Sequence, residues 1–224
     1  MNNKEPHKTF RKKTIIGKCL YYCLCLLIMP LVRLIWVKKV DGLKYVPKKG
    51  PYIIAANHQS YLDFVTVLSC WPDRLYFLAA EKFFISNFWR PLVEYTGQIR
   101  VDRDSKDKSA SMLAAAEYLK EGNIIAIFPQ GTRSRDGRIG RTFTGVAKLA
   151  IQSGVPVIPV GIAGAFELLP PQKKIPALRK NIVIRIGEPI RFTGALNDET
   201  EYRRATNQIM AKVAALAGLD YRPE

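Results

Sequence analysis

A histidine and an aspartate lie five residues apart in the polar segment NHQSYLD, residues 57–63. His58 is the only histidine outside the N-terminal tail, so imidazole chemistry in the body of the chain has one candidate. A histidine can remove a proton from a hydroxyl near neutral pH, and a carboxylate on its other ring nitrogen fixes the orientation of the ring. Asp63 is the nearest downstream carboxylate. The pair predicts a general base, His58, that Asp63 orients.

The spacing of this pair leaves a structural alternative open. Each helical residue adds about 100°, so side chains five residues apart on one helix point about 140° away from each other. His58 and Asp63 can meet only if the histidine lies in a turn and the aspartate in the first turn of a helix. In the alternative, the histidine caps the start of the helix and the helix dipole favours the aspartate there.

A second polar segment, FPQGTRS at residues 128–134, has the composition of an anion-binding loop. Gly131 lets backbone N–H groups approach a ligand closely, and the Arg133 guanidinium offers a fork that suits phosphate. Only Asp136 opposes the positive charge of this region. Three further arginines follow within eight residues: Arg135, Arg138 and Arg141. The segment predicts an anion site; the alternative is a basic, solvated glycine loop.

Other reaction chemistries find little support in the residues. Ser60 and Ser134 are hydroxyl nucleophile candidates, but neither lies in a Gly-x-Ser-x-Gly turn, so an acyl-serine mechanism is not expected. The chain has two histidines and no Cys-x-x-Cys pair. That composition does not favour a zinc site, and we expect no metal ion and no cofactor.

Apolar runs of strand length recur in the chain after Gly42. They occupy residues 52–56, 75–79, 99–101, 124–128, 157–162 and 182–186. Such runs, when they alternate with amphipathic helices, indicate an α/β sheet that is covered on both faces. The two polar segments follow the runs 52–56 and 124–128. If these strands are parallel, both segments lie at the edge of the sheet where ligands gather.

Three amphipathic stretches predict helices. The first covers residues 106–120, with one apolar face that contains Met112, Leu113, Ala116 and Leu119. The second covers residues 146–152 and ends at Gly154. The third follows Asp198 as candidate N-cap, ends at Gly218, and has an apolar face that contains Tyr202, Ala205, Ile209, Val213 and Leu216.

The charge of the chain is strongly positive and unevenly distributed. Its 224 residues include 35 Lys and Arg against 19 Asp and Glu, a net charge of +16, which predicts an anionic partner. Residues 1–40 hold nine of the cations and a single acid, Glu5. We expect two parts: residues 1–40 as a basic, apolar, membrane-associating segment, and residues 41–224 as one catalytic domain.

The N-terminal segment contains an uncharged run of 14 residues, 19–32. A bilayer-spanning helix needs about 20 apolar residues, and extending the run to 15–37 takes in two charges and a proline. A buried core helix and a secretory signal are the alternatives, although the segment lacks a small-x-small cleavage site. We expect a hydrophobic helix in or on the cytoplasmic face of the inner membrane, with its cations against anionic lipid.

Four blocks in order resemble the glycerophospholipid acyltransferase family, most closely the bacterial 1-acyl-sn-glycerol-3-phosphate acyltransferases. The first and third blocks are NHQSYLD and FPQGTRS. The second has Lys82 upstream and ends in Gly97, Ile99, Val101 and Arg103; the fourth is VPVIPV at 155–160. The resemblance covers roughly two-thirds of the chain, from Val40 to Gly187. One position departs from the family pattern: Gln130 stands where the third block usually has glutamate.

The resemblance implies a fold and a reaction. The fold would be a mixed, largely parallel central sheet flanked by helices, as in glycerol-3-phosphate acyltransferases. The reaction would move a fatty acyl group from acyl carrier protein or acyl-coenzyme A to the free hydroxyl of 1-acyl-sn-glycerol 3-phosphate, giving phosphatidic acid without an acyl-enzyme. His58 would be the base and Asp63 its orienting partner. The residues implied to bind the acceptor are Lys82, Arg103, Gln130, Gly131, Thr132 and Arg133.

Other functions remain as alternatives. The Gln130 departure favours another lysolipid acceptor, such as a lyso-ornithine lipid or lysophosphatidylglycerol, as the main one. A thioesterase would use water in place of the lipid hydroxyl. A nucleic-acid binder would explain the charge, but the sequence has no RNP-like aromatic motif and no recognisable helix-turn-helix. We therefore expect no nucleic-acid partner.

Overall fold

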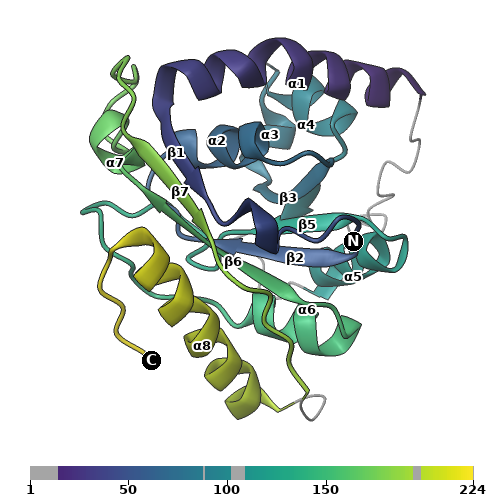
Figure 1. The fold of residues 1–224 in the computed structure, drawn as a ribbon. Coiled ribbons are helices and arrows are strands. Elements are labelled where there is room, and N and C mark those ends of the chain that lie inside the picture. Colours follow the sequence, from purple (N-terminus) through teal and green to yellow (C-terminus); the bar gives the residue numbers. More distant parts are fainter. Residues whose placement is uncertain (1–14, 88, 102–108, 194–197, 224) are drawn as a thin grey trace, which may run out of the picture.

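The computed structural model describes residues 15–87, 89–101, 109–193 and 198–223. Within these residues the strands form one seven-stranded sheet, ordered β1-β7-β6-β2-β5-β3-β4 (Figure 1). The strands are β1 Val37–Asp41, β2 Tyr52–Ala56, β3 Leu75–Ala80, β4 Ile99–Val101, β5 Ile124–Ile127, β6 Val157–Ala163 and β7 Ile182–Ile186. The six predicted strands are present with ends that agree to within one residue, because long apolar runs are local signals.

Helices lie between these strands and after them. They are α1 Ile15–Trp36, α2 Leu62–Cys70, α3 Lys82–Ile85, α4 Arg90–Tyr95, α5 Ser109–Lys120, α6 Gly145–Ser153, α7 Ala165–Leu168 and α8 Glu199–Ala217, with a 3-10 turn at Leu43–Tyr45. The predicted caps of the last helix are confirmed. The Asp198 carboxylate accepts hydrogen bonds from the N–H groups of Thr200 and Glu201, and Gly218 ends the helix with a φ of 70°.

Strand directions confirm a mixed, largely parallel sheet. β2 runs parallel to both of its neighbours, β5 and β6, and β3 runs parallel to β5 and β4. Among the strands in the described part of the chain, only the β6–β7 pair is antiparallel, which reverses β7 and its parallel neighbour β1 relative to the others. Because β2 and β5 are adjacent and parallel, their carboxyl ends lie side by side.

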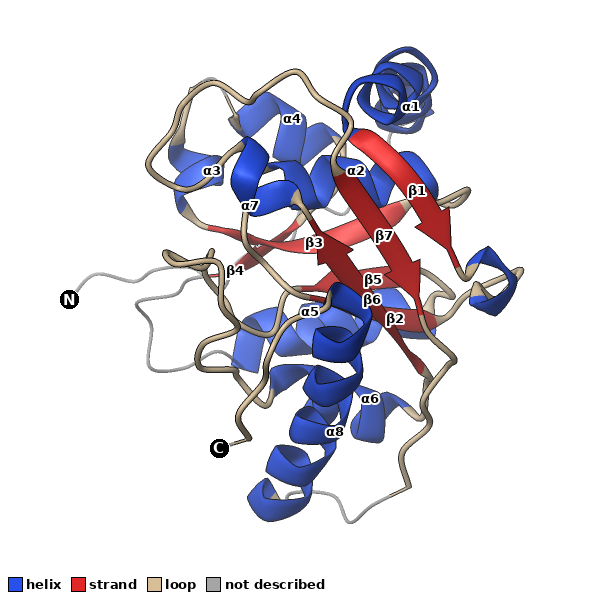
Figure 2. Ribbon diagram, turned by 60° about the vertical axis from the view of Figure 1, so that its left-hand side comes forward, coloured by secondary structure: helices blue, strands red, loops and turns tan. Residues whose placement is uncertain are grey.

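Helices cover both faces of the sheet, as the apolar strands predict (Figure 2). The side chains of a strand alternate between its faces. On β2, Tyr52 and Ile54 therefore pack into one apolar cluster, together with residues of α2 and α7. Ile53 and Ala55 pack into a second cluster with residues of α5, α6 and α8. Two separate cores thus hold β2 and the segment after it in place.

A buried tyrosine anchors the first cluster. The Tyr52 hydroxyl accepts a hydrogen bond of 2.8 Å from the indole N–H of Trp71, just beyond α2. Burial raises the pKa of Tyr52 to about 12, so the phenol stays neutral across the physiological range. This bond fixes the C-terminal end of α2 to the sheet.

The predicted apolar face of the helix at 106–120 is wrong in part. Residues 106–108 lie outside the described part of the chain, and α5 begins at Ser109. Its buried residues are Ser111, Ala115 and Leu119, whereas Leu113 is 67% exposed. Leu119 is buried as predicted, and Met112 and Ala116 are partly buried against the second cluster, so Leu113 is the predicted residue that lies on the wrong face.

The N-terminal segment forms a helix and a strand. α1 packs beside α2, and Val32 near its end is buried. Within the described residues, no helix is both long and apolar enough to cross a bilayer, whereas association of α1 with a membrane surface stays a prediction. Charges and Pro30 interrupt the apolar run of α1. β1 was not predicted: its sequence VKKVD has little strand signal, and pairing with β7 places it in the sheet.

A close approach between β6 and α8 gives a stability prediction. A Cβ on Gly161 would lie 2.3 Å from the backbone nitrogen of Ala217 and from the carbonyl carbon of Leu216. We expect Gly161→Ala to shift α8 and to lower the free energy of unfolding by about 1–3 kcal/mol, measured by chemical denaturation. Gly140→Ala is the matched control, because its Cβ would meet nothing within 4 Å. Equal stability of both variants and the wild type would contradict this packing.

Candidate active site

The two polar segments meet at the carboxyl edge of β2 and β5. The His58 N–H donates a hydrogen bond of 2.8 Å to the side-chain carbonyl oxygen of Gln130. The His58 carbonyl accepts one of 2.9 Å from the Ser134 N–H. A third bond runs from the Gln59 side-chain amide to the Gly137 carbonyl. These bonds join the segments into one unit, as their positions after parallel neighbouring strands predicted.

His58 and Asp63 are brought together in the predicted way. The histidine lies in the turn after β2 and the aspartate in the first turn of α2, with 2.9 Å between Nδ1 and Oδ2. The His58 side chain is 15% exposed, whereas that of Asp63 is fully buried. When the aspartate accepts a hydrogen bond from Nδ1–H, the neutral ring carries its free lone pair on Nε2. The pair therefore has the arrangement of a base and its orienting carboxylate.

Asp63 lies in the first turn of α2, as the alternative also expects, and it has a further structural role in the turn before that helix. The same oxygen, Oδ2, accepts hydrogen bonds from the N–H groups of Gln59 at 2.6 Å and Ser60 at 2.8 Å. The carboxylate thus shapes the turn that carries His58 as well as contacting its ring. The other oxygen, Oδ1, is buried and has no hydrogen-bond partner among the described residues. Asp63 therefore both orients the imidazole and stabilises the turn before α2.

Aromatic stacking holds the histidine ring on its other side. The rings of His58 and Phe128 lie 4.3 Å apart, centroid to centroid, with 17° between their planes. Phe77 on β3 stacks in turn on Phe128 at 5.9 Å. The imidazole is therefore fixed by a hydrogen bond at Nδ1 and by a ring face. Phe128 was not a predicted site residue, although it opens the second segment.

Asn57 fixes the start of the first segment and was missed by the sequence reasoning. Its side chain is fully buried. The amide nitrogen donates to the Ile162 carbonyl on β6, and the amide oxygen accepts from the Ile162 N–H, both at 2.8 Å. This two-way bond continues the β2–β6 pairing beyond the strand end. Its position immediately before His58 was the available signal.

Gln130 and Gly131 form the turn of the second segment. Gln130 is 5% exposed, and its side-chain carbonyl oxygen accepts the hydrogen bond from the His58 N–H. Gly131 has a φ of +66°, and a Cβ there would lie 2.8 Å from the ring of Phe143. Only glycine meets both the conformation and the space at this turn.

Arg133 carries the feature that points to an anion. Its guanidinium lies 3.6 Å from the centre of the Tyr61 ring. One terminal nitrogen, Nη1, is buried and has no hydrogen-bond partner among the described residues. A buried, unsatisfied cationic donor is costly unless a ligand satisfies it. Thr132 beside it is exposed, and Tyr61, which no prediction included, lies in the first segment just before α2.

The remainder of the basic loop is ordered by one acid. Asp136 accepts hydrogen bonds from the Ser134 hydroxyl at 2.9 Å and from the Arg138 N–H at 3.0 Å. The Arg138 N–H, followed by the Ser134 hydroxyl, lowers the pKa of this carboxyl. The surrounding arginines are exposed: Arg135, Arg138 and Arg141. The loop is thus a shaped turn with a cationic surface, and Ser134 has its hydroxyl committed to Asp136.

Lys82 is a predicted acceptor-binding residue that no contact joins to this cluster within the described residues. Lys82 begins α3 directly after β3, whose carboxyl end lies at the same edge of the sheet, and its side chain is exposed. Its Nζ lies 5.4 Å from the centre of the Phe83 ring. Arg103 lies outside the described residues. The block VPVIPV leads into β6, which agrees with its prediction as a strand rather than a site.

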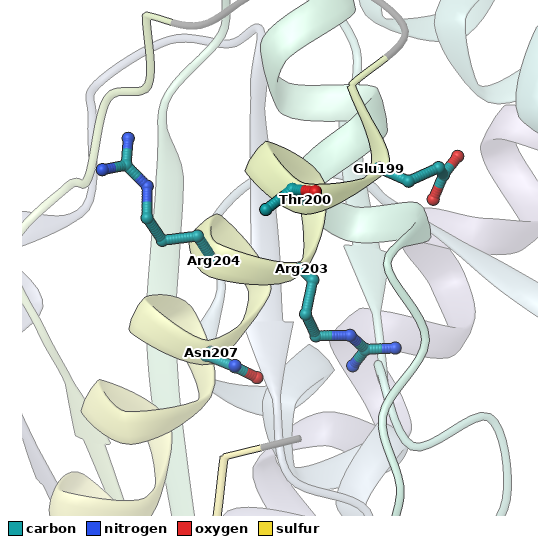
Figure 3. A pocket seen from close by; sticks show the side chains of 5 residues that line it. All are labelled: Glu199, Thr200, Arg203, Arg204 and Asn207. Atoms are coloured by element: carbon teal, nitrogen blue, oxygen red, sulfur yellow. The ribbon is translucent and has the colours of Figure 1, made fainter.

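A separate hollow of about 490 Å³ lies on the surface of α8 and is lined by Glu199, Thr200, Arg203, Arg204 and Asn207 (Figure 3). The side chains of Arg203 and Arg204 point to opposite sides of the helix. Arg203 donates to the Thr142 carbonyl at 3.0 Å, and Arg204 pairs with Glu201 at 2.8 Å. These side chains do not converge on a common point, so the hollow does not have the geometry of the candidate site.

Comparison with known proteins finds relatives that are similar to this chain in sequence. The profile of the family described as "Acyltransferase" matches residues 38–163. A chloroplastic 1-acyl-sn-glycerol-3-phosphate acyltransferase of Arabidopsis thaliana is 29% identical over 153 residues, 67% of this chain and 43% of that protein. One from Limnanthes douglasii is 33% identical over 132 residues, 56% of this chain and 45% of that protein. The chain thus spans less than half the length of these relatives.

A solved structure shares the fold. The crystal structure of a 1-acyl-sn-glycerophosphate acyltransferase from Thermotoga maritima has a TM-score of 0.70 and 24% identity, and the match covers 96% of this chain and 87% of that one. Its agreement concerns the arrangement of the sheet and helices. The family profile covers more than half of the chain, including both polar segments and the strands that carry them. The chain therefore belongs to the acyltransferase family.

Proposed function

We propose that the chain transfers a fatty acyl group from a thioester to the free hydroxyl of 1-acyl-sn-glycerol 3-phosphate, giving phosphatidic acid. The observation that carries the proposal is the juxtaposition of two features. A base oriented by a buried carboxylate, His58 with Asp63, shares a hydrogen-bonded unit with the unsatisfied donor of Arg133. The names of the relatives in this family support the same acceptor.

The geometry supports a direct transfer. Nε2 of His58 takes the hydroxyl proton as that oxygen attacks the thioester carbonyl carbon. The new C–O ester bond forms, the C–S bond breaks, and the imidazolium returns the proton to the leaving thiolate. The Asp63 carboxylate keeps the ring in place and stabilises its charged form. The acyl group passes in one transfer, with no covalent bond to the protein.

The serines of the two segments support this absence of an acyl-enzyme. The Ser60 hydroxyl donates to the Leu169 carbonyl at 2.8 Å and accepts from the Leu62 N–H. The Ser134 hydroxyl donates to Asp136. Each hydroxyl proton is thus committed to another oxygen, and within the described part of the chain the His58 ring forms no hydrogen bond with either serine hydroxyl.

In this proposal, residues of the second segment bind the acceptor phosphate. Arg133 offers a buried N–H that lacks a partner among the described residues, and Gly131 keeps the backbone free of a Cβ. Thr132 lies between them and is exposed. Lys82 and Arg103 complete the proposed set, as the family resemblance implies. Gln130 has a positioning role in this proposal, because its oxygen holds the His58 backbone.

The acceptor and the product are membrane lipids, so the proposal places the protein at the cytoplasmic face of the inner membrane. The outer side of α1 exposes Leu27, Leu31 and Leu34, which share one helix face. We call these three residues the apolar face of α1. An amphipathic helix of this kind binds in the plane of the lipid surface, and the basic N-terminal residues favour anionic lipid. The proposed donors are acyl carrier protein and acyl-coenzyme A.

A different lysolipid acceptor is the second candidate, and Gln130 favours it. A neutral amide beside the base leaves the potential of the site more positive than a glutamate would. The structure gives the amide oxygen a role that a carboxylate oxygen would also fill, since both accept the His58 N–H. The substitution therefore changes the charge of the site without removing its geometry.

The first prediction concerns the base. His58→Ala should lower kcat by about 10²–10⁴-fold, because it removes the group that takes the hydroxyl proton, and the thermal melt records the separate loss of its contacts with Asp63 and Phe128. Asp63→Asn keeps the size of the side chain and removes the charge that stabilises the imidazolium, so kcat should fall in the same step. Turnover assays with matched thermal melts check both variants. A kcat near that of the wild type in either one would exclude the mechanism.

The second prediction concerns the stacking of Arg133 on Tyr61. Tyr61→Leu should raise the KM for the phosphorylated acceptor by about 2- to 30-fold, because a cation–π contact contributes ~0.5–2 kcal/mol to the position of the guanidinium. Tyr61→Phe keeps the ring and should restore the wild-type KM, while kcat changes little in both. Arg133→Lys should raise the same KM. If these variants raised the KM for the acyl donor instead, the loop would belong to the donor site.

The third prediction concerns the acceptor. Wild-type protein assayed with lysophosphatidate, lysophosphatidylglycerol and a lyso-ornithine lipid should transfer fastest to lysophosphatidate. Gln130→Glu should stay active on it, because the carboxylate still accepts the His58 N–H. Gln130→Leu is the matched control and should lower activity on every acceptor, since it removes that bond. A Gln130→Glu variant that gains on lysophosphatidate and loses on another lysolipid would show that the natural acceptor is the other one.

A further inference from the structure

The segment between α7 and β7 presents apolar side chains within a run of cations. Ile175 is 81% exposed and Leu178 is 78% exposed, the largest exposed fractions among the large apolar side chains of the described residues. Four exposed cations flank them: Lys173, Lys174, Arg179 and Lys180. Residues 170–181 contain no acid. We call residues 172–180 the basic apolar loop.

The basic apolar loop has a defined conformation. The Lys173 N–H donates to the Pro170 carbonyl at 3.0 Å, and the Ala177 N–H donates to the Leu168 carbonyl of α7 at 3.0 Å. These backbone bonds hold the loop against the fold while its apolar tips face outward. A monomeric protein gains nothing from two fixed, exposed apolar side chains in water, so their exposure indicates a contact surface.

One end of this loop is fastened to α1. The indole N–H of Trp36, the last residue of α1, donates to the Ala177 carbonyl at 2.9 Å, and the Asn181 N–H donates to the Trp36 carbonyl at 3.1 Å. In Figure 1 the loop rises beyond α7, at the upper left, to the level of α1. The loop therefore lies at the same end of the molecule as α1.

The other end is fastened to the candidate site. The Gln172 side-chain amide donates to the carbonyl of Arg135, the residue directly after the second segment, at 3.3 Å. The Leu169 carbonyl, just before the loop, accepts from the Ser60 hydroxyl in the first segment. A surface that held the basic apolar loop would thus also hold the two segments that carry His58 and Arg133.

We propose that the basic apolar loop binds an anionic membrane surface, with Ile175 and Leu178 inserted between the head groups beside the apolar face of α1. Cations that flank exposed apolar tips fit such a surface, because the charges meet lipid phosphates while the tips enter the acyl boundary. A partner helix would bind in an apolar groove, whereas these two side chains project from a loop. The membrane contact itself does not depend on the proposed function. Only its expected benefit rests on that function, namely that a lipid acceptor can reach His58.

Tryptophan fluorescence of the full chain tests insertion directly. Leu178→Trp, mixed with vesicles of phosphatidylcholine and phosphatidylglycerol, should show added emission that shifts to the blue and is quenched by brominated lipid. Leu113→Trp is the matched control, because Leu113 is also exposed, at 67%, but lies on α5. The wild type supplies the background of the native tryptophans. Equal quenching of the residues introduced at 178 and 113 would overturn the proposal.

Vesicle cosedimentation tests the contribution of the loop to binding. Ile175→Ser with Leu178→Ser should weaken binding by about tenfold or more, since two apolar side chains leave the lipid. Lys173→Gln with Lys174→Gln should weaken binding only to vesicles that contain phosphatidylglycerol, and should reduce the effect of salt. Leu113→Ser and Lys212→Gln are the matched controls. Unchanged binding, with a loss confined to transfer from acyl carrier protein, would make the loop a protein-docking surface and the proposal wrong.

Activity separates this inference from the proposed function. In detergent micelles, where no bilayer is present, the Ile175→Ser, Leu178→Ser variant should transfer acyl groups at the wild-type rate. A micellar rate that fell with vesicle binding unchanged would place the loop in catalysis and contradict the inference. If the wild type transferred no acyl group while Leu178→Trp was still quenched, the proposed function would fail and the membrane contact would stand.

Discussion

The buried carboxylate of Asp63 is the interaction on which the site depends. A charge without solvent is costly unless hydrogen bonds and a favourable field compensate it. Here one oxygen accepts from the backbone of Gln59 and Ser60 and from the ring of His58, and the residue lies in the first turn of α2, where the helix dipole favours negative charge. The turn, the helix start and the orientation of the imidazole therefore form one cooperative unit.

The second segment completes that unit through backbone contacts rather than through its charge. Gln130 and Ser134 bind the N–H and the carbonyl of His58, so the residue is held from its main chain as well as from its ring. This arrangement explains how a glutamine can replace the usual glutamate. The position needs an acceptor oxygen at a fixed place, and both side chains provide one.

The residues of the proposed anion site are held by the same structural unit. Arg133 rests on Tyr61, which belongs to the first segment, so the proposed base and the proposed phosphate ligand cannot move independently. The segment after α7 connects this unit to the end of α1, through hydrogen bonds of Gln172 and Trp36. The proposed transfer to a membrane lipid would need a reacting group at a constant height above the lipid, and a chain of short contacts can provide that constraint.

The sequence alone determined what depends on neighbouring residues. Strands such as β7 and the capped start of α8 at Asp198 followed from apolar runs and side-chain capping, whereas the spacing of His58 and Asp63 allowed their meeting without requiring it. Tertiary structure alone decided the pairing of β1, the outward position of Leu113 on α5, the partner of Gln130 and the stacking of Tyr61 on Arg133. These features join residues distant in the chain, and only packing fixes which of several acceptable partners each one meets.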